Sequence, residues 1–96
     1  MLIAKGQSGE LRVGYQVAAK LGRWSIDLAD GAMGEVGWTC YAAIVSGDDY
    51  WLEHSDRFDL RLDVGRMQWR WQRVQLSIGN GQVVIPGTMR PELVRI

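Results

Sequence analysis

The residues best suited to catalysis or metal binding are one cysteine, Cys40, and one histidine, His54, in a chain of 96 residues. A histidine can activate a cysteine nucleophile, and both side chains can bind metal ions. With one of each, the chain cannot form an internal disulfide or a metal site built from several histidines or thiolates. Cys40 lies in an apolar segment, where a lone cysteine is expected to be a small buried hydrophobe. In the same interpretation, His54 lies on the surface. The alternative is that Cys40 and His54 form a catalytic pair.

Carboxylates gather around the histidine, and such residues could bind a hard cation. Asp48 and Asp49 share one turn, and Asp56 and Asp59 follow His54 closely. Cation sites need several oxygen ligands at defined loop spacing, and neither the EF-hand pattern nor an Asp-x-Asp-x-Asp run is present in the sequence. We therefore expect solvated carboxylates and no metal. The sequence also lacks a P-loop, a dinucleotide-binding fingerprint and a Gly-x-Ser-x-Gly motif, so we expect no cofactor and no enzymatic activity.

Tryptophan and arginine indicate a different chemistry, that of binding surfaces. The chain has five tryptophans, and nine of its eleven cationic residues are arginine. Trp, Tyr and Arg are enriched at protein–protein hot spots, and the same residue types can bind single-stranded nucleic acid. Alternation places Trp69 and Trp71 on the core side. Trp38 and Trp51 are better candidates for an exposed aromatic contact, although partial burial at a barrel rim is the default expectation for them as well. The candidate interaction residues are Trp38, Tyr50, Trp51, Arg66, Arg70 and Arg73.

The net charge of zero conceals a segregation along the chain. Residues 1–23 carry a balance of +3, residues 27–63 carry −7, and residues 66–96 carry +4. If the two basic parts lie together, the domain has a dipolar surface that could dock with a second copy or with a charged partner. Alternatively, neighbouring strands mix these charges on one face. Zero net charge disfavours nucleic acid, because phosphate neutralisation supplies most of such affinity.

Strands must position these residues, since apolar and polar residues alternate with a period of two along much of the chain. Residues 11–21 have the pattern of a half-buried strand, although a helix over 8–21 is the alternative. A Gly-X pair is typical of a two-residue hairpin turn. The Gly-Arg pair at 22–23 is therefore predicted to turn the chain and to place Leu21 opposite Trp24.

A second hairpin of the same kind is predicted later in the chain. Residues 58–64 alternate, and the Gly-Arg pair at 65–66 would place Leu62 opposite Trp69. The alternation then slips by one residue, which predicts a β-bulge near 72–73 within a long, bent strand.

The remaining segments complete the predicted sheet. Residues 31–37 are glycine-rich and are interpreted as a mobile loop, and residues 38–46, apolar on both faces, are predicted to form the most central strand. A turn at 46–49 leads into a further strand. Another hairpin turn is predicted at 79–81.

Together these elements predict an all-β fold, a single small antiparallel β-barrel or β-sandwich of about six to eight strands built from hairpins. The single domain would span residues 1–96, with residues 1–9 as a flexible lead-in and residues 87–96 as a tail or edge strand. No run approaches the ~18 apolar residues of a membrane-spanning helix, and the first residues do not resemble a signal peptide. We expect a cytoplasmic protein that does not bind membranes.

The function predicted from these features is a non-enzymatic protein–protein interaction or structural assembly module, acting as a homo-oligomer or within a larger assembly. A domain of this size buries only about two thirds of the surface of its unfolded chain, so self-association would add stability. Small accessory and structural proteins of phages and mobile elements often have this build, an analogy at the level of the fold alone. One alternative is a small-molecule-binding barrel. The other is an OB-like domain that binds single-stranded nucleic acid through Trp38, Trp51, Arg66, Arg70 and Arg73.

Overall fold

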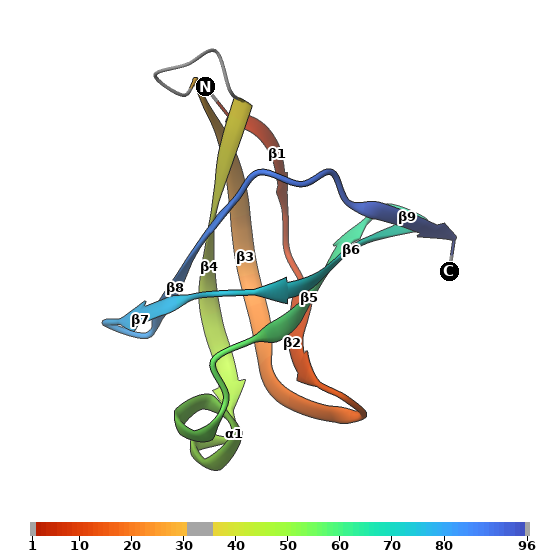
Figure 1. Ribbon diagram of the computed structural model, residues 1–96. Helices are drawn as coiled ribbons and strands as arrows, with labels where there is room; N and C mark the ends of the chain where they lie inside the picture. Colours follow the sequence, from red (N-terminus) through yellow and green to blue (C-terminus); the bar gives the residue numbers. More distant parts are fainter. Residues whose placement is uncertain (1, 31–35, 96) are drawn as a thin grey trace.

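The computed structural model describes residues 2–30 and 36–95, and this part of the chain forms nine strands and one short helix (Figure 1). In chain order the elements are β1 (Leu2–Gly6), β2 (Gly9–Val13), β3 (Gln16–Asp30), β4 (Val36–Gly47), α1 (Asp49–His54), β5 (Phe58–Val64), β6 (Met67–Val74), β7 (Ser77–Gly79), β8 (Gln82–Gly87) and β9 (Glu92–Arg95).

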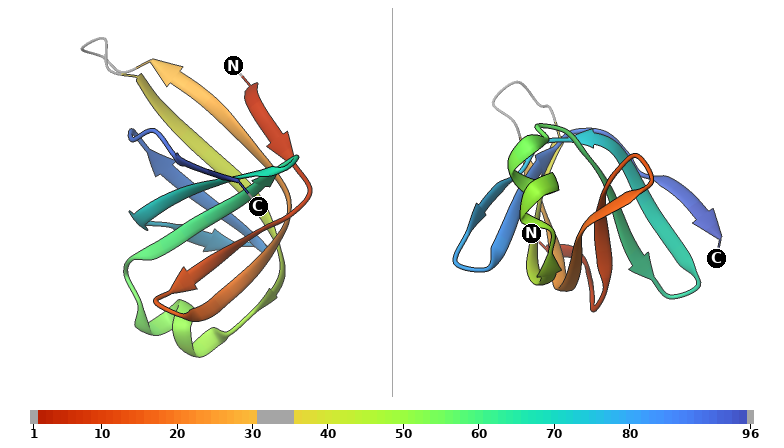
Figure 2. Two further views of the ribbon diagram at one scale, coloured as in Figure 1. Left: turned by 90° about the vertical axis from the view of Figure 1, so that its right-hand side faces the viewer. Right: turned by 90° about the horizontal axis from the view of Figure 1, so that it is seen from below.

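All nine strands belong to one antiparallel sheet with the order β7-β8-β4-β3-β2-β5-β6-β9, and β1 pairs with β3 off this path. The prediction of an all-β antiparallel fold is confirmed, although the described residues form nine strands and not about six to eight. The closed barrel is wrong, because the sheet path ends at β7 and β9, which do not pair with each other. The strands form one continuous sheet and not two separate sheets. Residues 88–91 join β8 to β9 without strand structure (Figure 2).

The sheet folds over so that β5 and β6 cross the long strands β3 and β4 (Figure 1). Trp38 of β4 and Trp71 of β6 illustrate this arrangement, since their ring centroids lie 4.8 Å apart although the two strands are not neighbours in the sheet. The buried core fills the concave side. Its members are Leu11, Ala18, Ala19, Leu21, Trp24, Ile26, Trp38, Cys40, Ala42, Phe58, Leu60, Leu62, Trp71, Val74, Val83 and Ile85.

The first part of the chain forms strands, as predicted, but turns at a different place. The Gly-Arg pair at 22–23 is a bulge within the continuous strand β3, because Leu21 pairs with Ile44 and Trp24 with Ala42. The predicted pairing of Leu21 with Trp24 is therefore wrong. The chain turns instead between β2 and β3, where Gly14 has a φ of +61° that glycine adopts readily.

The second Gly-Arg pair is a hairpin turn, as predicted. It joins β5 to β6 and places Leu62 opposite Trp69. The predicted bulge is also confirmed, because Phe58 pairs with Val74 and Leu60 with Trp71, which leaves the two residues at 72–73 opposite one residue of β5. The strand ends directly after this bulge and does not continue as one long strand.

The prediction of a strand after the turn at 46–49 is wrong, because residues 49–54 form helix α1. The carboxylate of Asp48 accepts a hydrogen bond of 3.1 Å from the backbone N–H of Tyr50, which caps the helix. Residues 2–6 were predicted to belong to a flexible lead-in. They instead form β1, which pairs with residues 24–27 of β3.

The other turn and the edge strand lie where they were predicted. Asn80 and Gly81 have left-handed φ values and join β7 to β8, and β9 is a short edge strand on β6. Strand β4 lies in the sheet interior between β3 and β8, but β3 and β2 lie at the middle of the path, so the prediction that it is the most central strand is wrong. Of the loop predicted at 31–37, residues 31–35 lie outside the described residues, and Gly37 belongs to β4.

Candidate interaction surfaces

The first candidate surface is the outer face of β4, formed by Tyr41, Ala43 and Val45. These side chains alternate with Trp38, Cys40 and Ala42, which face the core. Tyr41 is 38% exposed and Val45 is 70% exposed. An antiparallel sheet commonly leaves one face to solvent, but that face is then usually polar. The outer face of β4 is apolar, and no described element covers it.

The apolar surface continues onto part of β8, while Gln82 lies opposite Ala43 and Ser25 of β3 lies opposite Tyr41. The register places Tyr41 opposite Val84 and Thr39 opposite Pro86, so these residues share the outer side of the sheet. Pro86 is exposed, and Val84 is half-buried. A contiguous exposed apolar patch marks an interaction site, whereas isolated exposed apolar residues do not.

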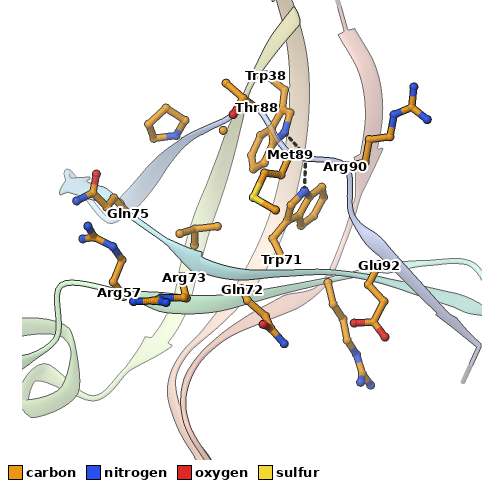
Figure 3. Close-up of a pocket in the computed structure, with 14 residues that line it drawn as sticks. Trp38, Arg57, Trp71, Gln72, Arg73, Gln75, Thr88, Met89, Arg90 and Glu92 are labelled. Carbon is orange, nitrogen blue, oxygen red and sulfur yellow. Dashed lines mark hydrogen bonds between the residues drawn. The ribbon is translucent and has the colours of Figure 1, made fainter.

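The second candidate surface is a groove between β6 and residues 86–90, called the seam groove from here on, with a volume of about 490 Å³ (Figure 3). It follows the open seam of the sheet, where β6 and β8 approach without pairing. The lining residues are Trp38, Arg57, Arg70, Trp71, Gln72, Arg73, Val74, Gln75, Pro86, Gly87, Thr88, Met89, Arg90 and Glu92.

Cationic groups dominate the seam groove, since Glu92 is the one carboxylate among four arginines in its lining. Arg57 donates to the backbone carbonyl of Asp56, and Gln75 accepts from both terminal nitrogens of Arg57 when its amide presents its oxygen to them. Nε of Arg70 donates to Oε1 of Gln68 at 2.7 Å.

The remaining two arginines of the groove, Arg73 and Arg90, are exposed, and their side chains make no hydrogen bond or ion pair within residues 2–30 and 36–95. Their guanidinium groups are thus available to an anion.

The floor of the seam groove is built from two tryptophans that are held in place by one carbonyl. The indole N–H groups of Trp38 and Trp71 both donate to the backbone oxygen of Met89, at 2.8 and 3.0 Å (Figure 3). Trp38 is 9% exposed and Trp71 is 5% exposed. Their ring faces are therefore covered by protein, and stacking a nucleic-acid base requires an accessible face.

The third candidate surface is the acidic end around α1, formed by Asp48, Asp49, Glu53 and Asp56. No lysine or arginine lies within residues 48–56, and all four acidic residues are exposed. Asp48 is engaged in capping the helix. The other three carboxylates have no hydrogen bond or ion pair in the described part of the chain.

Charges are mixed on the outer side of β2, β5, β6 and β9. The register places Glu10 opposite Arg61, Arg61 opposite Arg70, and Arg70 opposite Glu92. Glu10 forms ion pairs with Arg12 at 2.6 Å and with Arg61 at 3.9 Å. Opposite charges are therefore mixed on this face, which is one of the two arrangements considered from the sequence. The seam groove keeps an excess of positive charge, and the acidic end keeps an excess of negative charge.

The structure separates the predicted interaction residues. Arg70 and Arg73 line the seam groove, whereas Arg66 lies exposed in the β5–β6 turn and lines no part of it. Trp38 is buried and does not offer an exposed aromatic contact, because Trp71 of β6 packs against it.

Of the other two predicted residues, Trp51 of α1 is half-buried and packs against the core. Tyr50 is exposed and stacks on His54, with ring centroids 4.5 Å apart.

Cys40 and His54 lie in different environments. The Cys40 side chain is wholly buried in the core, and burial raises the pKa of its thiol to about 12. His54 is exposed at the end of α1, where its Nδ1 lies 2.8 Å from the backbone oxygen of Tyr50. The described residues contain no group of three or more His, Cys, Asp or Glu side chains that could hold a metal ion.

Two groove residues, Arg57 and Arg90, were missed by the sequence analysis. They lie 33 positions apart in the chain, and the folding of the sheet brings them to one seam.

No helix in the described residues is long and apolar enough to cross a membrane. No protein-family model, curated protein or solved structure matches the chain.

Proposed function

We propose that this chain is a non-enzymatic assembly module that associates with itself through the outer face of β4. One observation carries the proposal. Strand β4 lies in the interior of the sheet and is apolar on both faces, and its outer face is uncovered in the single chain. A second copy would supply the missing cover with the same apolar chemistry, as in two-fold dimers whose contact patches are self-complementary.

The expected strength of this contact follows from Val45, the most exposed residue of the outer face of β4. Burying a whole valine side chain contributes about 1.5 kcal/mol, and 70% of Val45 is exposed. Each copy would thus gain roughly 1 kcal/mol from this residue, and a two-fold contact roughly 2 kcal/mol. Losing that contribution corresponds to about a 30-fold weaker association.

The test is Val45→Glu, with the association measured by sedimentation equilibrium over a range of concentrations. A glutamate at this position would remove the apolar contact and place a charge in the interface, so we expect association at least about 30-fold weaker than that of the wild type. The matched control is Tyr15→Glu. Tyr15 lies in the β2–β3 turn, is 97% exposed and pairs with no residue of β4.

The control variant should associate as the wild type does. A wild-type chain that stays monomeric at every concentration would contradict the proposal. Equal losses in Val45→Glu and Tyr15→Glu would contradict the choice of the outer face of β4 as the contact.

A further inference from the structure

We infer that the seam groove is a carboxylate-binding site, and that its occupant is the acidic end around α1 of a second copy of this chain. The inference rests on the proposed self-association and adds a second contact to it. Three observations on the groove and on the acidic end carry the argument.

The first observation is the backbone of Arg73, which occupies the left-handed region with a φ of +59°. Most residues with a Cβ are strained there. The described chain uses glycine for similar φ values at Gly14, Gly65 and Gly81, and at Asn80 it uses asparagine, which tolerates this region. At the bulge of β6 it carries an arginine instead. Strain that a smaller residue would relieve is retained where the side chain has a function.

The second observation is the availability of the groove cations. Arg73 and Arg90 are exposed and have no partner among the described residues, and Arg57 lies near Arg73 at one end of the groove (Figure 3). A guanidinium group presents its donors in a planar fork that matches the two oxygens of a carboxylate. The groove therefore offers several carboxylate-binding groups above a rigid tryptophan floor.

The third observation is the complementary charge on the same chain. The seam groove carries four arginines against one carboxylate, and residues 48–56 carry four carboxylates without a lysine or arginine. Asp49, Glu53 and Asp56 have no cationic partner within the chain, as far as the structure describes it. The two surfaces have opposite charge, and each keeps charged side chains without a partner in the described residues, so they are complementary between two copies.

The groove favours carboxylates over nucleic acid for two reasons. Its tryptophan faces are buried, so they cannot stack bases. The chain has no net positive charge to concentrate a polyanion, and Glu92 lies within the groove.

The experiment reverses the charge of each surface and then combines the two. One variant carries Arg73→Glu and Arg90→Glu, and the other carries Glu53→Arg and Asp56→Arg. Sedimentation at low ionic strength should show each variant associating about tenfold more weakly than the wild type, because like charges would meet. An equimolar mixture of the two variants should regain association within a few fold of the wild type. In a mixed pair, the acidic groove of one variant meets the basic end of the other, and the basic groove meets the acidic end. In 1 M salt these differences should vanish, because screening then acts within about 3 Å.

Two further variants separate binding from folding. Arg66→Glu makes one such charge reversal in an exposed turn outside the groove and should associate as the wild type does. Arg73→Gly suits the left-handed backbone, so it should keep the urea midpoint of the wild type or raise it while weakening association severalfold.

Specific results would overturn the inference. If the Arg73→Glu, Arg90→Glu variant associates as the wild type does, or if the mixture fails to recover, the acidic end does not occupy the groove. The Val45→Glu variant tests the proposed function separately, because it changes the outer face of β4 and leaves the seam groove and the acidic end unchanged. Binding of a labelled thymidine oligonucleotide that is lost in the Arg73→Glu, Arg90→Glu variant, without recovery in the mixture, would assign the groove to nucleic acid instead.

Discussion

Gly87 allows a direct test of how the two halves of the sheet pack, and we predict that Gly87→Ala destabilises the fold. Gly87 lies on β8 directly opposite Trp38 of β4. A Cβ at this position would overlap Cζ2 and Cε2 of the Trp38 indole and would lie 2.6 Å from its Cη2. Atoms this close must move apart, so the outcome depends on whether the indole can shift.

The structure indicates that the indole has little room to move. Its ring centroid lies 4.8 Å from that of Trp71, and its N–H donates to the Met89 oxygen at 2.8 Å. Forcing extra atoms into a packed core costs about 1–3 kcal/mol. For a domain of this size each kcal/mol corresponds to about 4–8 °C in Tm, so we expect Tm to fall by roughly 4–24 °C.

Urea unfolding followed by tryptophan fluorescence measures this effect, and Gly79→Ala is the matched control. Gly79 also lies in a strand, but a Cβ there would meet no atom within 4 Å. The control should change the free energy of unfolding by no more than about 0.5 kcal/mol. Equal stabilities of Gly87→Ala and Gly79→Ala would refute the packing of Trp38 across Gly87.

Two other predictions concern the core cysteine and the helix cap. Burial raises the pKa of Cys40 from 9.0 to about 12, so the folded chain keeps the thiol protonated at pH values where the unfolded chain ionises it. The free energy of unfolding should therefore fall between pH 9 and pH 12 more steeply in the wild type than in Cys40→Ala, and parallel pH profiles would contradict this. Asp48→Ala should lower the free energy of unfolding by about 1 kcal/mol through loss of the cap on Tyr50 N–H, whereas Asp48→Asn should keep it, as urea titrations can show. Equal losses in both Asp48 variants would point to charge and not to capping.

The strand content could be predicted from the sequence because alternation records which side of a strand is buried. The positions of the turns could not always be predicted, as the two Gly-Arg pairs show. Each pair accompanies a one-residue change in alternation, which either a two-residue turn or a bulge can produce. At 65–66 the chain turns back, whereas at 22–23 it continues because β4 offers a partner to both halves of β3.

The candidate surfaces were only partly predictable for a similar reason. The bulge that carries Arg73 was predicted, because a local slip in alternation reveals it. The extent of Trp38 burial was not, because it depends on Trp71 arriving from a strand that is not its neighbour. The seam groove is likewise invisible in the sequence, since its arginines come from separate segments that meet only when the sheet folds over. Sequence showed that β4 is apolar on both faces, and only the structure showed that one of them is uncovered.

The measurement that addresses the central claim most directly is a comparison of ¹H–¹⁵N spectra of the wild-type chain at low micromolar and at millimolar concentration. If the outer face of β4 is the contact between copies, the amides of Tyr41, Ala43, Val45 and Val84 should shift as the concentration rises. The amides of the β2–β3 turn around Tyr15 should stay in place. Spectra that do not change with concentration, or shifts that leave the outer face of β4 unaffected, would contradict the account.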